Sequence, residues 1–106
     1  MQIIMHAGNA RNEVRDAMRL AREGDFGGAN ACMEHAKTEI VSAHNLQTGV
    51  LQETAGNPSY SPCLLFTHAQ DTLMTIQTEV NLGEEMLKTL ALVFGRLAKL
   101  EQAVKV

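Results

Sequence analysis

Apolar residues recur along the chain at alternating steps of three and four, the spacing that places side chains on one face of an α-helix. Two such stripes are separated by Gly24, which suits the left-handed conformation that ends many helices, and Asp25, which can cap the next helix. The pattern predicts helices over about residues 1–23 and 26–55. The first stripe comprises Ile3, Ala7, Ala10, Val14, Ala17 and Ala21, and the second comprises Phe26, Ala29, Met33, Ala36, Ile40, Ala43, Leu46 and Val50.

One loop interrupts this pattern at residues 56–62, where turn-forming residues and two prolines gather. Ser61 followed by Pro62 predicts a helix cap and the first helical residue after it. A third stripe then continues almost to the end of the chain and predicts a helix over about residues 62–104. Its members are Leu65, Ala69, Leu73, Ile76, Val80, Gly83, Leu87, Leu90, Phe94, Leu97 and Val104.

The third predicted helix is too long for the other two to cover. A helix of about 45 residues is roughly 65 Å long, because each residue adds 1.5 Å. Either this helix bends near Gly83 or Gly95, or copies of the chain associate so that their long helices share a central seam. We favour association of several copies.

Composition narrows the class of protein. A chain of 106 residues has room for one domain, and with 45% apolar residues, no Trp and one Tyr it suits an all-α fold. A net charge of -3, with scattered Lys and Arg, indicates neither nucleic acid nor an anionic membrane as partner. We find no membrane span or signal peptide, and therefore expect a cytoplasmic protein that does not insert into a membrane. Cys32 and Cys63 are expected to be free thiols.

His68 and Asp71 stand three residues apart early in the third predicted helix, which places them on one face. That face also carries Thr72 and Thr75 and lies beside the apolar stripe, so we expect it to border an interface and to be partly buried. A neutral imidazole with one free nitrogen can attack a phosphoryl group, and a carboxylate can bind a cation. A histidine and an aspartate at this spacing on a helix more often form only a surface hydrogen bond with each other.

The other histidines give weaker signals. His6, His35 and His44 form no zinc-binding spacing, with one another or with His68. We expect His35 to make a solvent-facing pair with Glu39 one turn later, and His44 to be a polar boundary residue. No phosphate-cradling glycine loop or serine-nucleophile motif is present, so the standard enzyme classes are not indicated.

Several segments, taken in order, carry a more specific signal than any single motif. They are residues 3–11, 21–26, 43–48 and 52–56, followed by His68-Ala69-Gln70-Asp71 with Leu73-Met74-Thr75. Together they resemble the lactose/cellobiose-type enzyme IIA of the bacterial phosphoenolpyruvate-dependent sugar phosphotransferase system. The last segment is similar to the phosphorylation motif of that family, and the resemblance covers roughly residues 1–90.

The resemblance implies a homotrimer of antiparallel three-helix bundles that carries phosphate on His68, in a cleft between neighbouring chains. It implies that the Asp71 carboxylates of three chains surround a divalent cation, usually magnesium, because three carboxylates cannot crowd together unneutralised. Phosphate would arrive from the general carrier protein HPr and leave to a cysteine of a IIB component, for uptake of a disaccharide of the lactose, cellobiose or chitobiose type. Gln70, Thr67 and Thr72 are the candidate supporting residues.

The chain departs from the family pattern in three places. Thr72 stands where the family commonly has a second histidine, the amino terminus looks shorter, and residues 91–106 extend beyond the usual end. Either this tail lengthens the central bundle or divergence accounts for it. The rival hypothesis is a non-catalytic helical interaction module, or a metal-binding one, on the same bundle. The sugar is not predicted, because selectivity is expected to reside in the membrane component.

Overall fold

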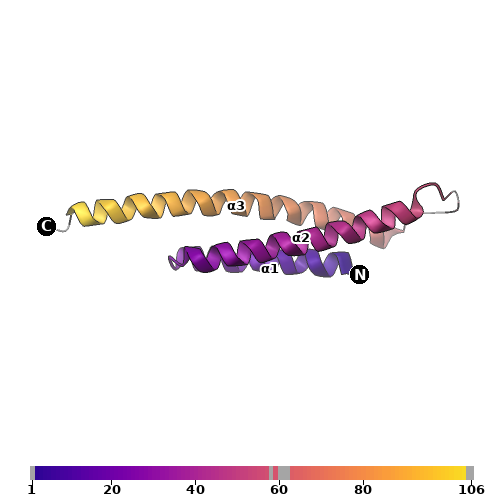
Figure 1. The fold of residues 1–106 in the computed structure, drawn as a ribbon, viewed down its shortest axis with the longest axis horizontal. Coiled ribbons are helices and arrows are strands. Elements are labelled where there is room, and N and C mark those ends of the chain that lie inside the picture. Colours follow the sequence, from indigo (N-terminus) through magenta and orange to yellow (C-terminus); the bar gives the residue numbers. More distant parts are fainter. Residues whose placement is uncertain (1, 58, 60–62, 105–106) are drawn as a thin grey trace.

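The protein folds into a long, slender bundle. The computed structural model describes residues 2–57, 59 and 63–104, and over these residues it contains α1 (Gln2–Arg22), α2 (Phe26–Thr54) and α3 (Leu64–Val104). Helices α1 and α2 lie side by side, and α3 packs along both before it projects far beyond the turn that joins them (Figure 1). The expected all-α class with three helices is confirmed for this part of the chain.

The turn between α1 and α2 forms as the sequence predicts. Gly24 has a φ of 85°, in the left-handed region, and the Asp25 carboxylate accepts a hydrogen bond from the Gly28 N–H at 2.8 Å. A Cβ atom on Gly28 would lie 2.4 Å from Oδ2 of Asp25, so a larger residue there would displace the capping carboxylate. Gly28 costs helix propensity, but its missing side chain leaves room for the cap.

The start of α3 uses a cap that the sequence pattern did not suggest. The expected cap at Ser61 and Pro62 lies outside the described residues. Cys63 directly precedes the helix, and its Sγ accepts a hydrogen bond from the Phe66 N–H at 3.3 Å. The thiol therefore satisfies one of the free N–H groups in the first turn. Cys32 and Cys63 are both free thiols, as predicted.

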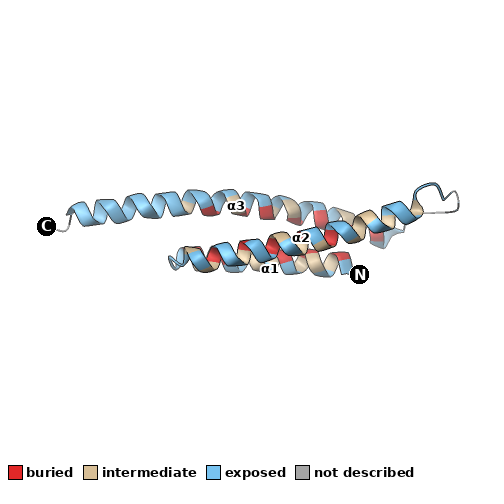
Figure 2. Cartoon of the chain, in the orientation of Figure 1, coloured by how far each residue is buried: buried red, intermediate tan, exposed pale blue. Residues whose placement is uncertain are grey.

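All three helices share one apolar core, which follows the predicted stripes (Figure 2). One expectation was wrong: Leu65 is 54% exposed, and Phe66, at 5%, takes the core position instead. The steps from Phe66 through Ala69 to Leu73 alternate between three and four, whereas a stripe through Leu65 needs two successive steps of four and turns away from the core. Val14, Phe26, Leu46, Val50 and Leu90 pack at the margin of the core and are only partly buried.

Helix α3 runs without a break and without a sharp kink past Gly83 and Gly95, so the bend considered from the sequence is not present (Figure 1). Gly83 instead allows close helix packing, because a Cβ atom there would lie 3.1 Å from Cγ1 of Val14. From Ala91 to Val104 every residue of α3 is exposed, although the ring of Phe94, also expected in the core, packs edge-on against Phe26 at the start of α2, with ring centroids 5.1 Å apart. Leu97 and Val104, expected in the core, therefore lie in solvent in the single chain.

The expected pair between His35 and Glu39 is also wrong. Glu39 interacts with His6 of α1, and Nδ1 of His35 lies 3.8 Å from a carboxylate oxygen of Glu13. Both histidines thus have partners on opposite helices, which spacing within one helix cannot reveal. Because α1 packs along α2, each side chain finds an acidic group across the helix–helix contact.

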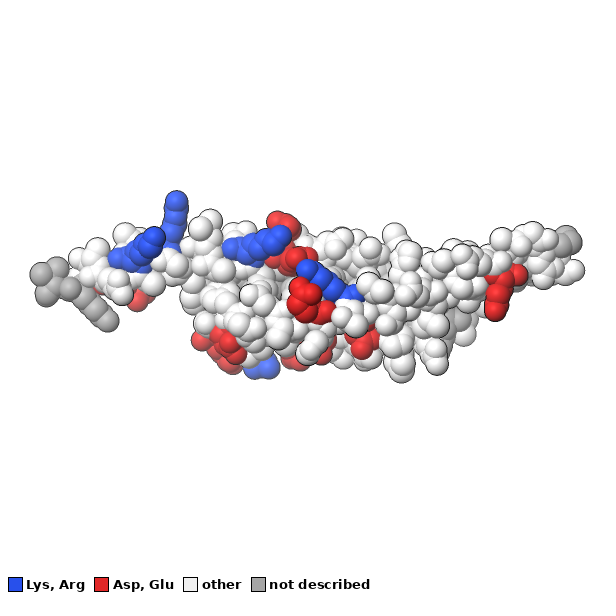
Figure 3. Space-filling view, viewed as in Figure 1, with Lys and Arg blue, Asp and Glu red and all other residues white. Residues whose placement is uncertain are grey.

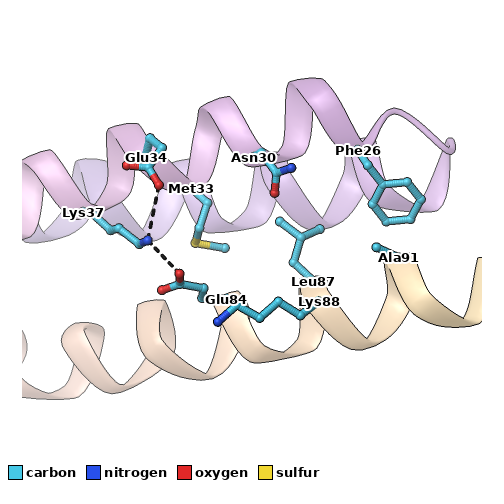
Figure 4. A pocket seen from close by; sticks show the side chains of 9 residues that line it. All are labelled: Phe26, Asn30, Met33, Glu34, Lys37, Glu84, Leu87, Lys88 and Ala91. Carbon is cyan, nitrogen blue, oxygen red and sulfur yellow. Dashed lines mark hydrogen bonds and ion pairs between the residues drawn. The ribbon is translucent and has the colours of Figure 1, made fainter.

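Two ionic contacts tie α3 to the other helices. Arg11 of α1 donates two hydrogen bonds to the Glu79 carboxylate, from Nε at 2.8 Å and from Nη2 at 3.0 Å. Lys37 of α2 donates from Nζ to Glu84 at 2.7 Å (Figure 4). Hydrogen bonding raises the pKa of Arg11 and of Lys37 and lowers that of Glu84, so all three groups stay charged at neutral pH.

Arg11→Lys is expected to lower the free energy of unfolding by less than about 1 kcal/mol, because an ammonium group cannot reproduce the two-pronged contact but the pair is partly screened by water. Urea titration of both proteins at fixed chain concentration measures the difference. Arg19→Lys is the control. Among the described residues, the ionic partners of Arg19 are Asp16 and Glu23, which lie near it at the end of α1 and not on another helix. An equal loss of unfolding free energy in both variants would show that the contact between α1 and α3 adds nothing to stability.

Candidate functional site

The residues singled out from the sequence lie at the beginning of α3, at the end of the molecule opposite its projecting tail. Phe66, Ala69 and Leu73 occupy the core positions of this segment, so the residues between them are left at the surface. The partial burial expected for the face with His68, Asp71, Thr72 and Thr75 holds in the single chain for Thr72 alone. Gln70 and Thr72 are half-buried, and Thr67, His68 and Asp71 are exposed.

The imidazole of His68 makes no hydrogen bond or ion pair with any residue that the structure describes, and neither does the carboxylate of Asp71. The simple alternative, a surface hydrogen bond between the two side chains, is therefore not formed in this structure. Thr75 instead donates from Oγ1 to the backbone carbonyl of Asp71 at 2.9 Å. His68 is exposed and its ring nitrogens have no partner among the described residues, which leaves a nitrogen free to act as a nucleophile.

The hydroxyl of Thr67 is already engaged. Its Oγ1 donates to the backbone carbonyl of Cys63, one turn earlier, at 3.4 Å. In this rotamer the proton of Thr67 does not point to a group bound on His68. The half-buried amide of Gln70 has no such backbone bond among the described contacts and is the more available donor of the two.

Two leucines that the sequence did not mark as functional lie beside His68. Leu64 and Leu65 are 85% and 54% exposed, and with His68 they line a shallow hollow of about 490 Å³. Single exposed aliphatic side chains are common, but adjacent ones that form a patch can mark a surface that a partner covers. The signal for this hollow in the sequence is only indirect: the alternation of three and four that starts at Phe66 leaves Leu65 out of the core.

This end of the molecule carries almost no formal charge. Glu53 is the only Asp, Glu, Lys or Arg between Glu39 and Asp71, and no Lys or Arg occurs between Lys37 and Lys88. The corresponding end of the space-filling view is accordingly almost free of coloured side chains (Figure 3). An anion bound on the imidazole would thus be held by neutral hydrogen-bond donors of this chain or by groups of a partner.

A second hollow, of about 220 Å³, lies between α2 and α3 (Figure 4). Its apolar walls include Phe26, Met33 and Leu87. Of its charged groups, Lys37 pairs with two lining carboxylates, and Lys88 pairs with Glu85 outside the hollow. Nζ of Lys37 lies 2.7 Å from Glu84 and 3.3 Å from Glu34. Since this lysine is already neutralised by two carboxylates, the hollow offers an anion little attraction.

The described part of the single chain forms no complete metal site from its side chains. Among the described residues, no group of three or more His, Cys, Asp or Glu side chains is arranged to hold a metal. Asp71 fits a hard cation as one oxygen ligand, because its carboxylate is exposed and has no ionic partner among these residues. The remaining ligands would have to be water or carboxylates of further copies.

We find no helix in the described part of the chain that is both long and apolar enough to cross a bilayer.

Comparison with known proteins gives consistent matches. Residues 1–91 match the family model described as "PTS system, Lactose/Cellobiose specific IIA subunit". The lichenan-specific phosphotransferase enzyme IIA component of Bacillus subtilis is 36% identical over 87 residues, which cover 82% of this chain and 79% of that protein. The N,N'-diacetylchitobiose-specific EIIA component of Escherichia coli is 33% identical over 88 residues, covering 83% and 76%.

Solved structures agree with these matches. The crystal structure of the cellobiose-specific enzyme IIA from Bacillus anthracis superimposes with a TM-score of 0.81 at 32% identity, covering 89% of this chain and 86% of that one. The IIA(chitobiose) structure solved in complex with HPr from Escherichia coli gives a TM-score of 0.77 at 30% identity, covering 86% and 88%.

Proposed function

The chain belongs to the lactose/cellobiose-specific IIA family of the phosphotransferase system, and from this premise we propose that it is a cytoplasmic phosphoryl carrier that holds phosphate on the imidazole of His68. Components of this family take part in phosphotransfer, so the general class of activity follows from family membership. The observation that supports His68 as the carrier is its exposed ring, free of partners among the described residues and bordered by the open side chains of Leu64 and Leu65.

In the proposed acceptance step, a ring nitrogen of neutral His68 attacks the phosphorus of a phosphohistidine on HPr. The new N–P bond forms as the N–P bond of the donor breaks. The donor imidazole leaves with the electron pair of that bond and, protonated on its other nitrogen, departs neutral, while the phosphorylated His68 ring returns its own N–H proton to solvent. Since the two phosphoimidazoles are chemically alike, catalysis consists mainly of positioning and of stabilising the charge of a loose transition state. The related IIA(chitobiose) was solved with HPr, which supports the same donor for this chain.

In the proposed release step, a cysteine thiolate of a IIB component attacks the phosphoryl group, an S–P bond replaces the N–P bond, and His68 returns to its free form. We assign Gln70 as the principal neutral donor to the phosphoryl oxygens, with Thr67 and Thr72 as supporting residues. Thr67 reaches such an oxygen only if its hydroxyl leaves the Cys63 carbonyl. If a partner covers Leu64 and Leu65, the neutral, partly apolar surroundings of His68 would exclude water and slow hydrolysis of the carried phosphate.

The proposed working form is a homotrimer in which the α3 helices pack around a common axis. This arrangement would cover the exposed face of α3 and bring three Asp71 carboxylates together. A divalent cation, most simply Mg²⁺, would neutralise them and complete its shell with oxygen ligands. The carrier would serve an uptake system for a disaccharide of the lactose, cellobiose or chitobiose type.

Asp71→Leu is expected to remove bound divalent cation, because the variant lacks the only ligand that each chain contributes. We expect about one cation per three chains in the unaltered protein and none in the variant, measured by elemental analysis after dialysis against buffer with Mg²⁺. Asp16→Leu, which removes an exposed carboxylate of α1, is the control. Equal metal content in Asp71→Leu and the unaltered protein would contradict a shared axial site.

Reconstitution of the relay tests the function directly. Label from phosphoenolpyruvate, supplied with enzyme I and HPr, should pass to this chain and then to a cognate IIB component. The rival hypothesis, a helical interaction or metal-binding module without phosphotransfer, predicts that label stops at HPr. Label that stops there under conditions that phosphorylate the Escherichia coli relative would reject the carrier.

A further inference from the structure

The hydroxyl of Thr72 differs from those of the other threonines of α3. Each of the others donates its Oγ1 proton to the backbone carbonyl four residues earlier, a common bond of a threonine within a helix. They are Thr67, Thr75, Thr78 and Thr89. Thr72 is half-buried, and its hydroxyl makes no hydrogen bond with any residue that the structure describes. Both its proton and its lone pairs are therefore available to a neighbouring side chain.

The neighbour within reach of this hydroxyl is His68. Side chains four residues apart on a helix lie on one face, with Cβ atoms about 5–6 Å apart. His68 therefore lies between an apolar neighbour one turn before it, Leu64, and a polar neighbour one turn after it, Thr72. The ring of His68 is exposed and has no partner among the described residues, so it is free to turn toward the hydroxyl.

Helix α2 contains the same pair with the contact formed. His44 and Thr48 are also four residues apart, and here too the histidine is exposed and the threonine half-buried. Nδ1 of His44 lies 3.5 Å from Oγ1 of Thr48. A histidine and a threonine at this spacing in this chain thus meet through Nδ1, the ring nitrogen nearer the backbone, and Nε2 is left for another group.

We propose that Thr72 is a positioning residue that binds Nδ1 of His68 and leaves Nε2 to take the phosphoryl group. This inference rests on the proposed function and specifies how the carrier ring is held. In the free protein, Nδ1–H of His68 donates to Oγ1 of Thr72. This bond fixes the tautomer in which Nε2 has the lone pair that attacks phosphorus.

A hydroxyl suits both states of the ring because it can accept and donate. When the bond between Nε2 and phosphorus forms, the N–P bond of the donor breaks and the Nδ1 proton of His68 passes to solvent. Nδ1 then presents a lone pair, and the hydroxyl of Thr72 turns to donate to it. The ring is thereby held in one orientation before and after transfer, which a hydroxyl already bonded to the backbone could not achieve.

Thr72→Val tests this role, because valine has nearly the shape of threonine without the hydroxyl. We expect kcat for phosphoryl acceptance from HPr to fall by about three- to tenfold with KM for HPr little changed, the loss that one hydrogen bond explains. Thr72→Ser keeps the hydroxyl and should recover most of the rate. Helix content, measured by circular dichroism, should be unchanged in both variants.

Nitrogen NMR of the imidazole rings gives a readout that a packing role, or a bond from Thr72 to the phosphoryl oxygens, would not move. In the unphosphorylated chain Nδ1 of His68 should carry the proton, and Thr72→Val should shift the ring toward the tautomer mixture of a free imidazole. Thr48→Val is the matched control. It should alter the ring signals of His44 and leave those of His68, and phosphoryl acceptance, unchanged.

Unchanged ring signals of His68 in Thr72→Val would overturn the proposal, as would phosphate on Nδ1 in the phosphorylated chain or a failure of Thr72→Ser to recover the rate. The tautomer is measured on the free protein, without HPr or phosphate. Loss of the carrier proposal, seen as no label on the unaltered chain, is therefore distinguishable from loss of the contact between Thr72 and His68.

Discussion

His68→Gln should reduce phosphoryl acceptance from HPr by about a thousandfold or more, because a glutamine amide has no basic nitrogen with which to attack phosphorus. The fold should be unchanged, since the ring of His68 is exposed and makes no hydrogen bond or ion pair with the described residues. Transfer of label from phosphorylated HPr, with helix content checked by circular dichroism, measures both expectations.

His44→Gln is the matched control for this prediction. His44 is an exposed histidine of α2, whose Nδ1 lies 3.5 Å from Oγ1 of Thr48, and it has no proposed part in transfer. The control should accept phosphate at the rate of the unaltered chain. If His68→Gln accepts label as fast as His44→Gln, the phosphoryl group is not carried on His68.

Leu73→Ala is expected to lower the free energy of unfolding by about 2–5 kcal/mol, the usual range for a buried leucine that leaves a cavity. Leu73 is 0% exposed and, with Ile76, is one of the two largest fully buried side chains. The core around it contains many alanines, whose short side chains cannot move to fill the space. Urea unfolding at one fixed chain concentration measures the loss, because association would otherwise alter the apparent stability.

Leu92→Ala is the control for this core substitution. It deletes the same atoms from a side chain that is 63% exposed, so it should change stability by less than about 0.5 kcal/mol. Similar losses in the two variants would mean that Leu73 is not in the core that the structure describes.

Much of the fold follows from local signals in the sequence. Gly24 and Asp25 predict where α1 ends and α2 begins, since one permits the left-handed conformation and the other caps the next helix. The periodic stripes predict most of the core. Leu65 was misplaced because a stripe read at steps of four drifts around the helix, and a strict alternation of three and four would have selected Phe66.

Contacts between helices were the part that the sequence could not supply. Glu39 has a histidine one turn before it in the sequence, yet it pairs with His6, because the packing of α1 on α2 decides which groups meet. The spacing of His68 and Asp71 likewise permitted a mutual hydrogen bond, and only the structure shows that none forms there. The exposure of Leu64 and Leu65 follows from the sequence only indirectly, since it depends on whether the core stripe begins at Leu65 or at Phe66.

The position of the phosphate is the most direct test of the account. The unaltered chain is incubated with phosphoenolpyruvate, enzyme I and HPr, digested under alkaline conditions, and its peptides are sequenced by tandem mass spectrometry. We predict one acid-labile phosphate per chain, on the imidazole of His68. Phosphate found on another residue, or no phosphate under conditions that fully phosphorylate HPr, would contradict it.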